Sequence, residues 1–285
     1  MGPLLTPLED PYRSRAAPPA SARYWSWLFA APESRDPLIG VYALTAEWRA
    51  LIDPATEPQA AAIKLAWWEQ EIARLVAAAP LHPITRFLSG LPCAGCVDFS
   101  PLHASLEAAA RQLAGAPLER GAELEAHGAA LWATPLMAAA HLARELTGES
   151  ARALQRSVSA LGAAQYLEDS IADYRRSALH GRVIFPVDEL LAAGIEDSDL
   201  TASPAPERLR SYLDRLRSRA AALYRGAADQ MPGSERASLR HLLVLATLGA
   251  EHSERRTRSA GAFRPADLFK AWSAARRATR HSPKH

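Results

Sequence analysis

Cysteine is scarce in this chain, whose 285 residues include two, Cys93 and Cys96, in the sequence PCAGC. A structural zinc site needs four ligands, and the sequence offers no second CxxC pair. We therefore interpret the pair as part of a turn rather than as half of a zinc site or as a redox centre. So few cysteines are typical of a protein from a reducing compartment, and we expect a cytoplasmic location.

Net charge and long apolar runs are lacking as well. The 33 Lys and Arg residues against 31 Asp and Glu give a net charge of +2, which is too small to indicate binding of nucleic acid. No apolar run approaches the roughly 18 residues of a transmembrane helix, and we expect no signal sequence. The charge is uneven, because residues 255–284 are rich in Arg and Lys and contain one acid, Asp267. That end is either a solvated basic tail or a surface for peripheral contact with a membrane, a phosphate or a protein partner.

Alternating strand patterns and internal repeats are also absent, whereas helical periodicity recurs along the chain. Helices are expected over residues 22–30, 38–52, 59–79, 84–91, 101–113, 118–146, 151–179, 187–193, 207–231, 234–258 and 265–280. Pro32 and Pro37 bracket an expected turn. Because the linkers are short and the helices long, we predict one all-α domain over residues 22–280, a flexible N-terminal arm over 1–21 and a tail over 281–285.

The densest group of charged side chains lies on the expected helix 151–179 and just after it. Asp169 and Asp173 are four residues apart, so a helix places both carboxylates on one face. Two aligned carboxylates can hold a divalent cation such as magnesium. Arg175, Arg176 and Arg182 follow, and arginines can bind a diphosphate through paired hydrogen bonds. The alternative is a solvated helix face with ordinary ion pairs.

Three stretches resemble the squalene/phytoene synthase family, and they occur in that family's order. They are LFAAPESRDPLIGVYAL (28–44), KLAWWEQEIARL with the following His-Pro (64–84), and ADYRRSALHGRVIFPVDEL (172–190). The resemblance covers residues 23–272, nearly the whole chain, and makes an unrelated helical bundle the weakest alternative.

The resemblance implies an all-α, isoprenoid-synthase-like bundle around a central apolar cavity. It implies a transferase of isoprenoid biosynthesis that joins farnesyl or geranylgeranyl diphosphates head to head with Mg²⁺ held by two facing acidic motifs. It assigns catalytic roles to Asp169, Asp173 and Tyr42, metal binding to Asp169, Asp173 and Asp53, and diphosphate binding to Arg35, Arg175, Arg176 and Arg182. Core packing for Tyr42 and a turn-capping role for Arg35 are the structural alternatives.

The first acidic motif departs from the family pattern. Where the family has an arginine and then two adjacent aspartates, this chain has Ala46, Arg49 and Ala50, and only Asp53 matches. A cation at a ligand position repels magnesium, so we expect a weakened or lost metal site. Glu47, Asp53 and Glu71 are the nearby carboxylates that could substitute.

The second motif fits in two registers one helical turn apart, and Asp173 belongs to both. The leading hypothesis is thus a diverged family member that acts on a prenyl-type ligand with weakened chemistry. The alternative is a non-catalytic assembly or binding factor, since relatives that serve respiratory complex I assembly have lost similar motifs. The PESR turn, the paired tryptophans of the helix 59–79 and the weakened first motif resemble those relatives. A dry ion pair between Arg49 and Asp173 would favour this alternative.

Overall fold

The computed structural model describes residues 8–146, 148–255 and 265–280, and every regular element in them is helical, as the sequence predicts. The α-helices are α1 (Asp10–Ala16), α2 (Ala22–Leu28), α3 (Pro32–Ile52), α4 (Pro58–Val76), α5 (Pro83–Ser89), α6 (Leu102–Leu113), α7 (Gly121–Gly128), α8 (Thr134–Ala143), α9 (Gly148–Leu179), α10 (Val187–Ala192), α11 (Asp197–Thr201), α12 (Glu207–Gln230), α13 (Arg240–Glu254) and α14 (Pro265–Arg280). Short 3-10 turns cover Ala94–Cys96 and Gly233–Glu235, and a π-helical turn covers Ala129–Ala133. Within these ranges, no helix is long and apolar enough to cross a membrane.

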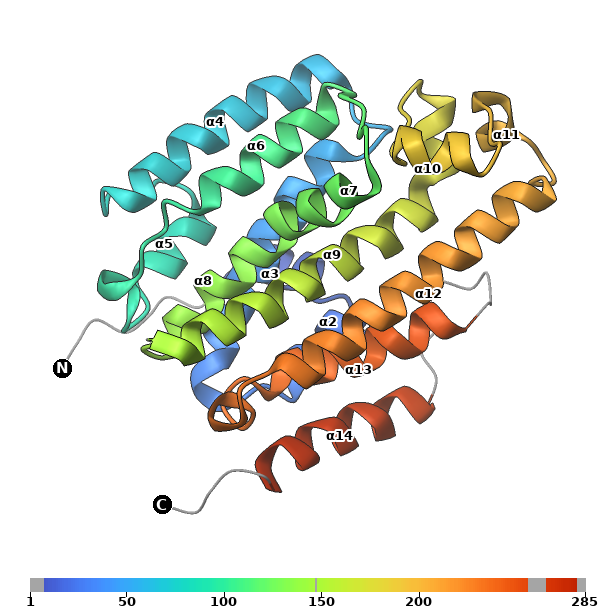
Figure 1. Cartoon of the computed structure of the whole chain (residues 1–285). Helices are drawn as coiled ribbons and strands as arrows, with labels where there is room; N and C mark the ends of the chain where they lie inside the picture. Colours follow the sequence, from blue (N-terminus) through green and yellow to red (C-terminus); the bar gives the residue numbers. More distant parts are fainter. Residues whose placement is uncertain (1–7, 147, 256–264, 281–285) are drawn as a thin grey trace.

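The 32-residue helix α9 runs through the middle of the bundle, with α12 on one side and α7 and α8 on the other (Figure 1). Its buried stripe includes Leu154, Val158 and Leu161, spaced as one helix face requires. Gly162 lies on this face, and a Cβ there would come within 2.7 Å of the backbone nitrogen of Ala133. The missing side chain therefore lets α9 approach the π-helical turn closely.

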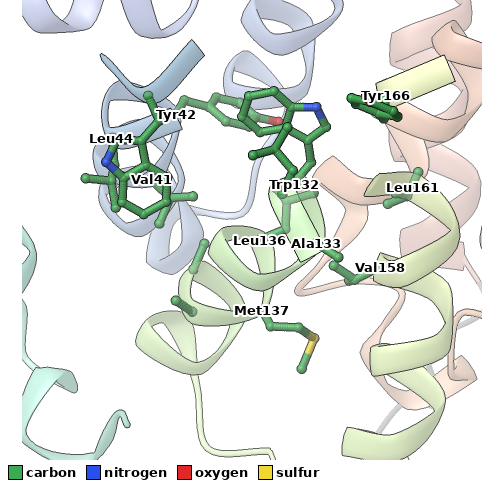
Figure 2. Packing of buried hydrophobic residues seen from close by; sticks show 14 of the residues in the cluster. Val41, Tyr42, Leu44, Trp132, Ala133, Leu136, Met137, Val158, Leu161 and Tyr166 are labelled. Atoms are coloured by element: carbon green, nitrogen blue, oxygen red, sulfur yellow. The ribbon is translucent and has the colours of Figure 1, made fainter. Parts of the chain in front are cut away.

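The core fills the space between α3, the π-helical turn with α8, and α9. Figure 2 shows Tyr42 and Val41 from α3 with Trp132 and Leu136, and Val158 and Leu161 of α9 beyond them. All six side chains are 3% exposed or less. This packing fixes α3 and α9, the two helices that carry the candidate acidic residues.

The helices at residues 32–52 and 118–146 differ from the prediction in where they begin or break. The expected turn at residues 32–37 is helical and forms the start of α3, with Pro32 in its first turn, where proline costs no hydrogen bond. The expected helix 118–146 is divided into α7, the π-helical turn and α8. Pro135 has no N–H to continue a regular helix, and the nearby Ala130 carbonyl accepts the hydroxyl hydrogen bonds of Ser105 and Thr134.

Part of the N-terminal arm predicted over residues 1–21 is helical, because residues 10–16 form α1. Helix α1 packs against α3, and Leu8, Ala16 and Ala17 are buried in the main core. Arg15 also forms an ion pair with Glu47 of α3 at 3.0 Å. The proline-rich composition of this segment gave no indication that Leu8, Ala16 and Ala17 would be buried. Residues 1–7 and the predicted tail 281–285 lie outside the described part of the chain.

Candidate functional site

A cavity of about 750 Å³ lies between α3, α9, α12 and α13, beside α1 and the start of α2. Its lining includes the apolar side chains Trp25, Leu245 and Leu248 and the charged side chains Arg23, Arg49, Glu168 and Asp169. The cavity therefore offers both apolar and charged side chains to a ligand. A central apolar cavity was predicted, but the charged lining residues make this cavity amphipathic.

The three carboxylates proposed as metal ligands each face an arginine. Asp169 Oδ1 accepts a hydrogen bond from Arg49 Nη2 at 2.5 Å. Arg176 reaches two carboxylates, Asp173 at 3.0 Å and Asp53 at 3.1 Å. Arg49, which stands at a metal-ligand position of the first acidic motif, therefore forms an ion pair with Asp169 of the second motif.

The Arg49–Asp169 pair lies on the cavity wall and remains partly open. The side chain of Arg49 is 44% exposed and that of Asp169 24%, so this is not the dry pair with Asp173 considered from sequence. The charge of Asp169 raises the pKa of Arg49, which keeps the guanidinium positively charged at every ordinary pH. The wall therefore holds a permanent cation in front of its acidic motif.

Arg23 adds a second cation to this wall, and sequence reasoning gave it no role. Burial lowers the pKa of Arg23, and the neighbouring charge of Arg49 lowers it further. Its guanidinium lies 5.4 Å from the ring centroid of Tyr42, and its Nη1 donates to Thr45 Oγ1 at 3.5 Å. Nothing in the local sequence signals this, because the contacts come from another helix.

A second polar group in the cavity lining is centred on Glu168, next to Asp169 on α9. The hydroxyls of Tyr224 and Ser253 donate hydrogen bonds to its carboxylate at 2.8 and 2.6 Å. Burial raises the pKa of Glu168 to about 7, although the two hydroxyl donors oppose the shift. The ring of Tyr224 rests on Gly249 of α13, where a Cβ would lie 2.4 Å from Cζ of the ring. A mid-helix glycine at position 249 was the one sequence signal that could have indicated this close contact.

The raised pKa of Glu168 predicts a pH dependence of stability. Its proton is bound more tightly in the folded state, so the stability it contributes is complete below about pH 4.5 and is lost as the pH rises through about 7. The neutral variant Glu168→Gln keeps an acceptor oxygen and should escape this loss. Between pH 5 and pH 8 we expect the variant to gain roughly 1–3 kcal/mol relative to the natural chain. Urea denaturation of both at the two pH values measures this, and parallel pH profiles would contradict the assignment.

Comparison with known proteins identifies the family of this chain. The model of the family described as "Squalene/phytoene synthase" matches residues 17–273. The chain belongs to the squalene/phytoene synthase family. Among curated proteins it is similar to a phytoene synthase of Zea mays, with 24% identity over 74% of this chain and 50% of the relative, and to one of Narcissus pseudonarcissus, with 26% identity over 73% and 50%. The chain thus spans about half the length of the curated relatives it matches.

Solved structures place this family member in the all-α isoprenoid-synthase-like fold. It superposes on a crystal structure of a dehydrosqualene synthase in complex with a ligand with a TM-score of 0.70, at 16% identity, over 95% of this chain and 97% of the other. A structure of squalene synthase HpnC from Alicyclobacillus acidocaldarius gives a TM-score of 0.66 at 20% identity, over 96% and 93%. The expected fold and family are therefore confirmed.

The residues assigned to diphosphate binding by resemblance do not line the cavity of about 750 Å³ in this squalene/phytoene synthase-family structure. Arg35 is exposed in the first turns of α3, where it donates to the Leu28 carbonyl at 3.5 Å, and Arg175 is exposed on α9. Arg182 lines a separate small pocket with His127. Arg176, paired with the two aspartates, is the member of this set that lies closest to the acidic residues.

Tyr42, and the two carboxylates Glu47 and Glu71 that could substitute for the missing ligands, each have structural contacts. The Tyr42 hydroxyl shares a hydrogen bond with Ser26 at 2.9 Å, and the side chain is 2% exposed within the core. Glu47 pairs with Arg15. Glu71 is fully buried and accepts hydrogen bonds from the backbone N–H groups of Leu81 and His82, so it cannot replace a missing ligand in this arrangement.

The family is generally metal-dependent, and its metal can be tested against these residues. Magnesium requires near-octahedral oxygen ligands and usually binds through carboxylates that are free to coordinate it. Across residues 8–146, 148–255 and 265–280, no three side chains of His, Cys, Asp or Glu are grouped closely enough to hold a metal ion. The aspartates that come nearest are bound to Arg49 and Arg176. The site as arranged does not fit a magnesium cluster.

Proposed function

We propose that this protein is a non-catalytic binding member of the squalene/phytoene synthase family. It holds an isoprenoid ligand in the cavity between α3 and α9 and does not carry out magnesium-dependent condensation. The observation that carries this proposal is the ion pair between Arg49 and Asp169, which puts a fixed cation at the place of a metal ligand.

Electrostatics explain why this pair matters for the chemistry. A divalent cation at Asp169 would have to displace Arg49 or lie beside its positive charge. Arg176 imposes the same cost at Asp173 and Asp53. Ionisation of an allylic diphosphate relies on bound metal to stabilise the leaving group. This site therefore lacks the metal ions that the family reaction needs for that step.

The cavity itself supports retained ligand binding. Its volume of about 750 Å³ lies within the usual range of small-molecule sites. Trp25 and Leu248 supply apolar lining suited to a prenyl chain, and the charged lining residues can orient a head group. A prenyl alcohol and a prenyl diphosphate are both candidate ligands, with binding independent of magnesium.

The test combines an activity assay with a binding assay on the purified chain. Incubation with farnesyl or geranylgeranyl diphosphate and magnesium should give neither product nor diphosphate release. Farnesol and an unreactive thio-analogue of farnesyl diphosphate should raise the melting temperature by the same amount with and without magnesium. Ala50→Trp, which fills the cavity, should abolish the shift, whereas Ala62→Trp on the exposed face of α4 should retain it.

Diphosphate release by the natural chain that is lost in Asp173→Ala would overturn the proposal, because it would show that the protein is an active synthase. If neither compound shifts the melting temperature, the proposed ligand is wrong, but the proposed loss of condensation activity still holds.

A role as an assembly factor, such as for respiratory complex I, is the second candidate. The feature that favours it is the outer face of α4, where Ile63 is 67% exposed and Trp67, one turn later, is 39% exposed. Contiguous exposed apolar patches mark contact sites for a protein partner, and these two side chains lie next to each other on one face of α4. This candidate predicts that Ile63→Glu, in a host that makes the complex, lowers the amount of assembled complex while cavity binding is unchanged.

A further inference from the structure

The two cysteines of the chain lie in the connection between α5 and α6, and neither of them lines the cavity. Cys93 precedes the 3-10 turn Ala94–Cys96, and the backbone N–H of Cys96 donates to the Cys93 carbonyl at 3.0 Å. This hydrogen bond closes a four-residue turn, which brings the Cα atoms of its two ends within about 7 Å of each other. The turn that the sequence analysis expected at PCAGC is therefore confirmed, and it holds the two cysteines close together.

The geometry of this turn places the two thiols side by side. Residues three apart eclipse each other along a 3-10 helix, so Cys93 and Cys96 belong to the same face of the turn. A disulfide joins Cα atoms about 4.4–6.8 Å apart, a range that the turn already meets. Both cysteines are free, with Cys96 exposed and Cys93 half-buried. A reagent in solution therefore reaches Cys96 first and finds Cys93 beside it.

The turn is anchored on its inner side and open on its outer side. Leu91, Ala94 and Phe99 are buried in the main core, and the backbone N–H of Ala94 donates to the Leu91 carbonyl at 3.0 Å. A Cβ at Gly95, between the cysteines, would meet no atom within 4 Å. The core thus fixes the position of the turn while its tip lies in solvent. Joining the two sulfurs requires no change in the packing below them.

Metal binding does not explain this pair. A structural zinc site needs four ligands. Within residues 8–146, 148–255 and 265–280, no group of three His, Cys, Asp or Glu side chains could hold a metal ion, so the two thiols have no further ligand beside them. The chemistry left to an accessible pair of neighbouring thiols is exchange with another disulfide.

We propose that Cys93 and Cys96 form a dithiol site that exchanges with small-molecule disulfides such as oxidised glutathione. The Cys96 thiolate, formed by loss of its proton to solvent, attacks one sulfur of the disulfide, whose S–S bond breaks to release one thiol. The Cys93 thiolate then attacks Cys96 Sγ and expels the second thiol. The two cysteines lose two electrons and two protons, and the small disulfide takes them up as two thiols. This exchange does not depend on the ligand held in the cavity.

The experiment treats the purified full chain with oxidised glutathione and follows its intact mass. Cys93 and Cys96 are the only cysteines of the 285 residues, so the mass reports on this pair alone. The natural chain should lose both free thiols and carry no glutathione, and dithiothreitol should restore the thiols. Cys93→Ser should stop at the mixed disulfide, with one glutathione on Cys96. Cys96→Ser should react at least about tenfold more slowly, because the remaining thiol is half-buried.

A spacing variant with two glycines inserted after Gly95 is the matched control, since it keeps both thiols and breaks the turn. Its equilibrium constant for disulfide formation in a glutathione redox buffer should be at least about tenfold lower than that of the natural chain. The melting temperature of its reduced form shows that it folds. The natural chain should keep its own melting temperature or gain on oxidation, because the turn already holds the cysteines together.

Three results would overturn the proposal. The first is a natural chain whose thiols stay free in oxidised glutathione, and the second is one that carries a stable glutathione on each cysteine. The third is an equal equilibrium constant for the natural chain and the spacing variant, which would mean that the turn does not favour the disulfide. The Cys93→Ser adduct tests the order of attack even if the spacing variant fails to fold.

Discussion

Glu71→Ala is expected to lower the free energy of unfolding by about 3–5 kcal/mol, the range for removing one partner of a buried charged network. Glu71 is fully buried. Its Oε1 accepts from the backbone N–H groups of Leu81 and His82, both at 2.8 Å, and from the Thr85 hydroxyl. Its Oε2 accepts from Arg74 at 2.8 Å. Alanine would leave the two backbone N–H groups and Arg74 without this acceptor, whereas the Thr85 hydroxyl would keep the His82 carbonyl. It would also release the turn that joins α4 to α5.

Urea denaturation measures this loss, and Glu69→Ala provides the control, because Glu69 is exposed on the same helix and should change stability by no more than about 0.5 kcal/mol. Burial opposes the charge of Glu71, but hydrogen bonds from Thr85, His82, Arg74 and Leu81 lower its pKa overall. The stability it contributes is therefore present above about pH 4.5 and is lost as the pH falls through its lowered folded-state pKa. A loss below about 1 kcal/mol at pH 7, or a loss that grows in acid, would contradict this account.

Gly249→Ala should destabilise the protein by about 2–4 kcal/mol and close part of the cavity. A Cβ at position 249 would lie 2.4, 2.5 and 2.6 Å from three ring atoms of Tyr224. That ring is 1% exposed and its hydroxyl is held by Glu168, so it cannot move without breaking the hydrogen bond. Overpacking and the loss of this bond act together.

The matched control for this variant is Gly226→Ala, on α12 close to Tyr224 itself. A Cβ there would meet one atom, Nε2 of Gln230, at 3.8 Å. Replacing a helical glycine in open space should stabilise the protein by about 0.5–1 kcal/mol. Thermal unfolding of both variants, with and without farnesol, separates the effects. Equal melting temperatures for the two would mean that Tyr224 does not depend on Gly249 for its position.

Much of this fold could be predicted from periodicity, because long amphipathic helices carry their signal in every turn. The expected helices 151–179 and 207–231 end within a few residues of α9 and α12. The break inside 118–146 was missed, because one proline and a π-helical turn leave the apolar pattern almost unchanged. Helix α1 was missed because its attachment rests on a few small apolar residues.

The candidate site could be predicted only in part, because its decisive contacts join distant segments. The sequence placed Asp169 and Asp173 on one face and identified Arg49 as the wrong charge at a ligand position. It could not give their pairing, since Arg49 and Asp169 are 120 residues apart. For the same reason, the role of Arg23 depends on the packing of α2 against α3, and that of Tyr224 on the packing of α12 against α9. The ion pairs of Arg176, which the resemblance assigns to diphosphate binding, with two aspartates could not be predicted either.

Direct metal binding tests the central claim, that arginines have taken the place of the magnesium site. Manganese can stand in for magnesium, and its free concentration can be followed by electron paramagnetic resonance during titration with the purified chain, with and without the thio-analogue of farnesyl diphosphate. The account predicts no stoichiometric binding to the natural chain in either condition. Stoichiometric, ligand-dependent manganese binding that is lost in Asp169→Asn would contradict it, and would mean that Arg49 yields its partner to the metal.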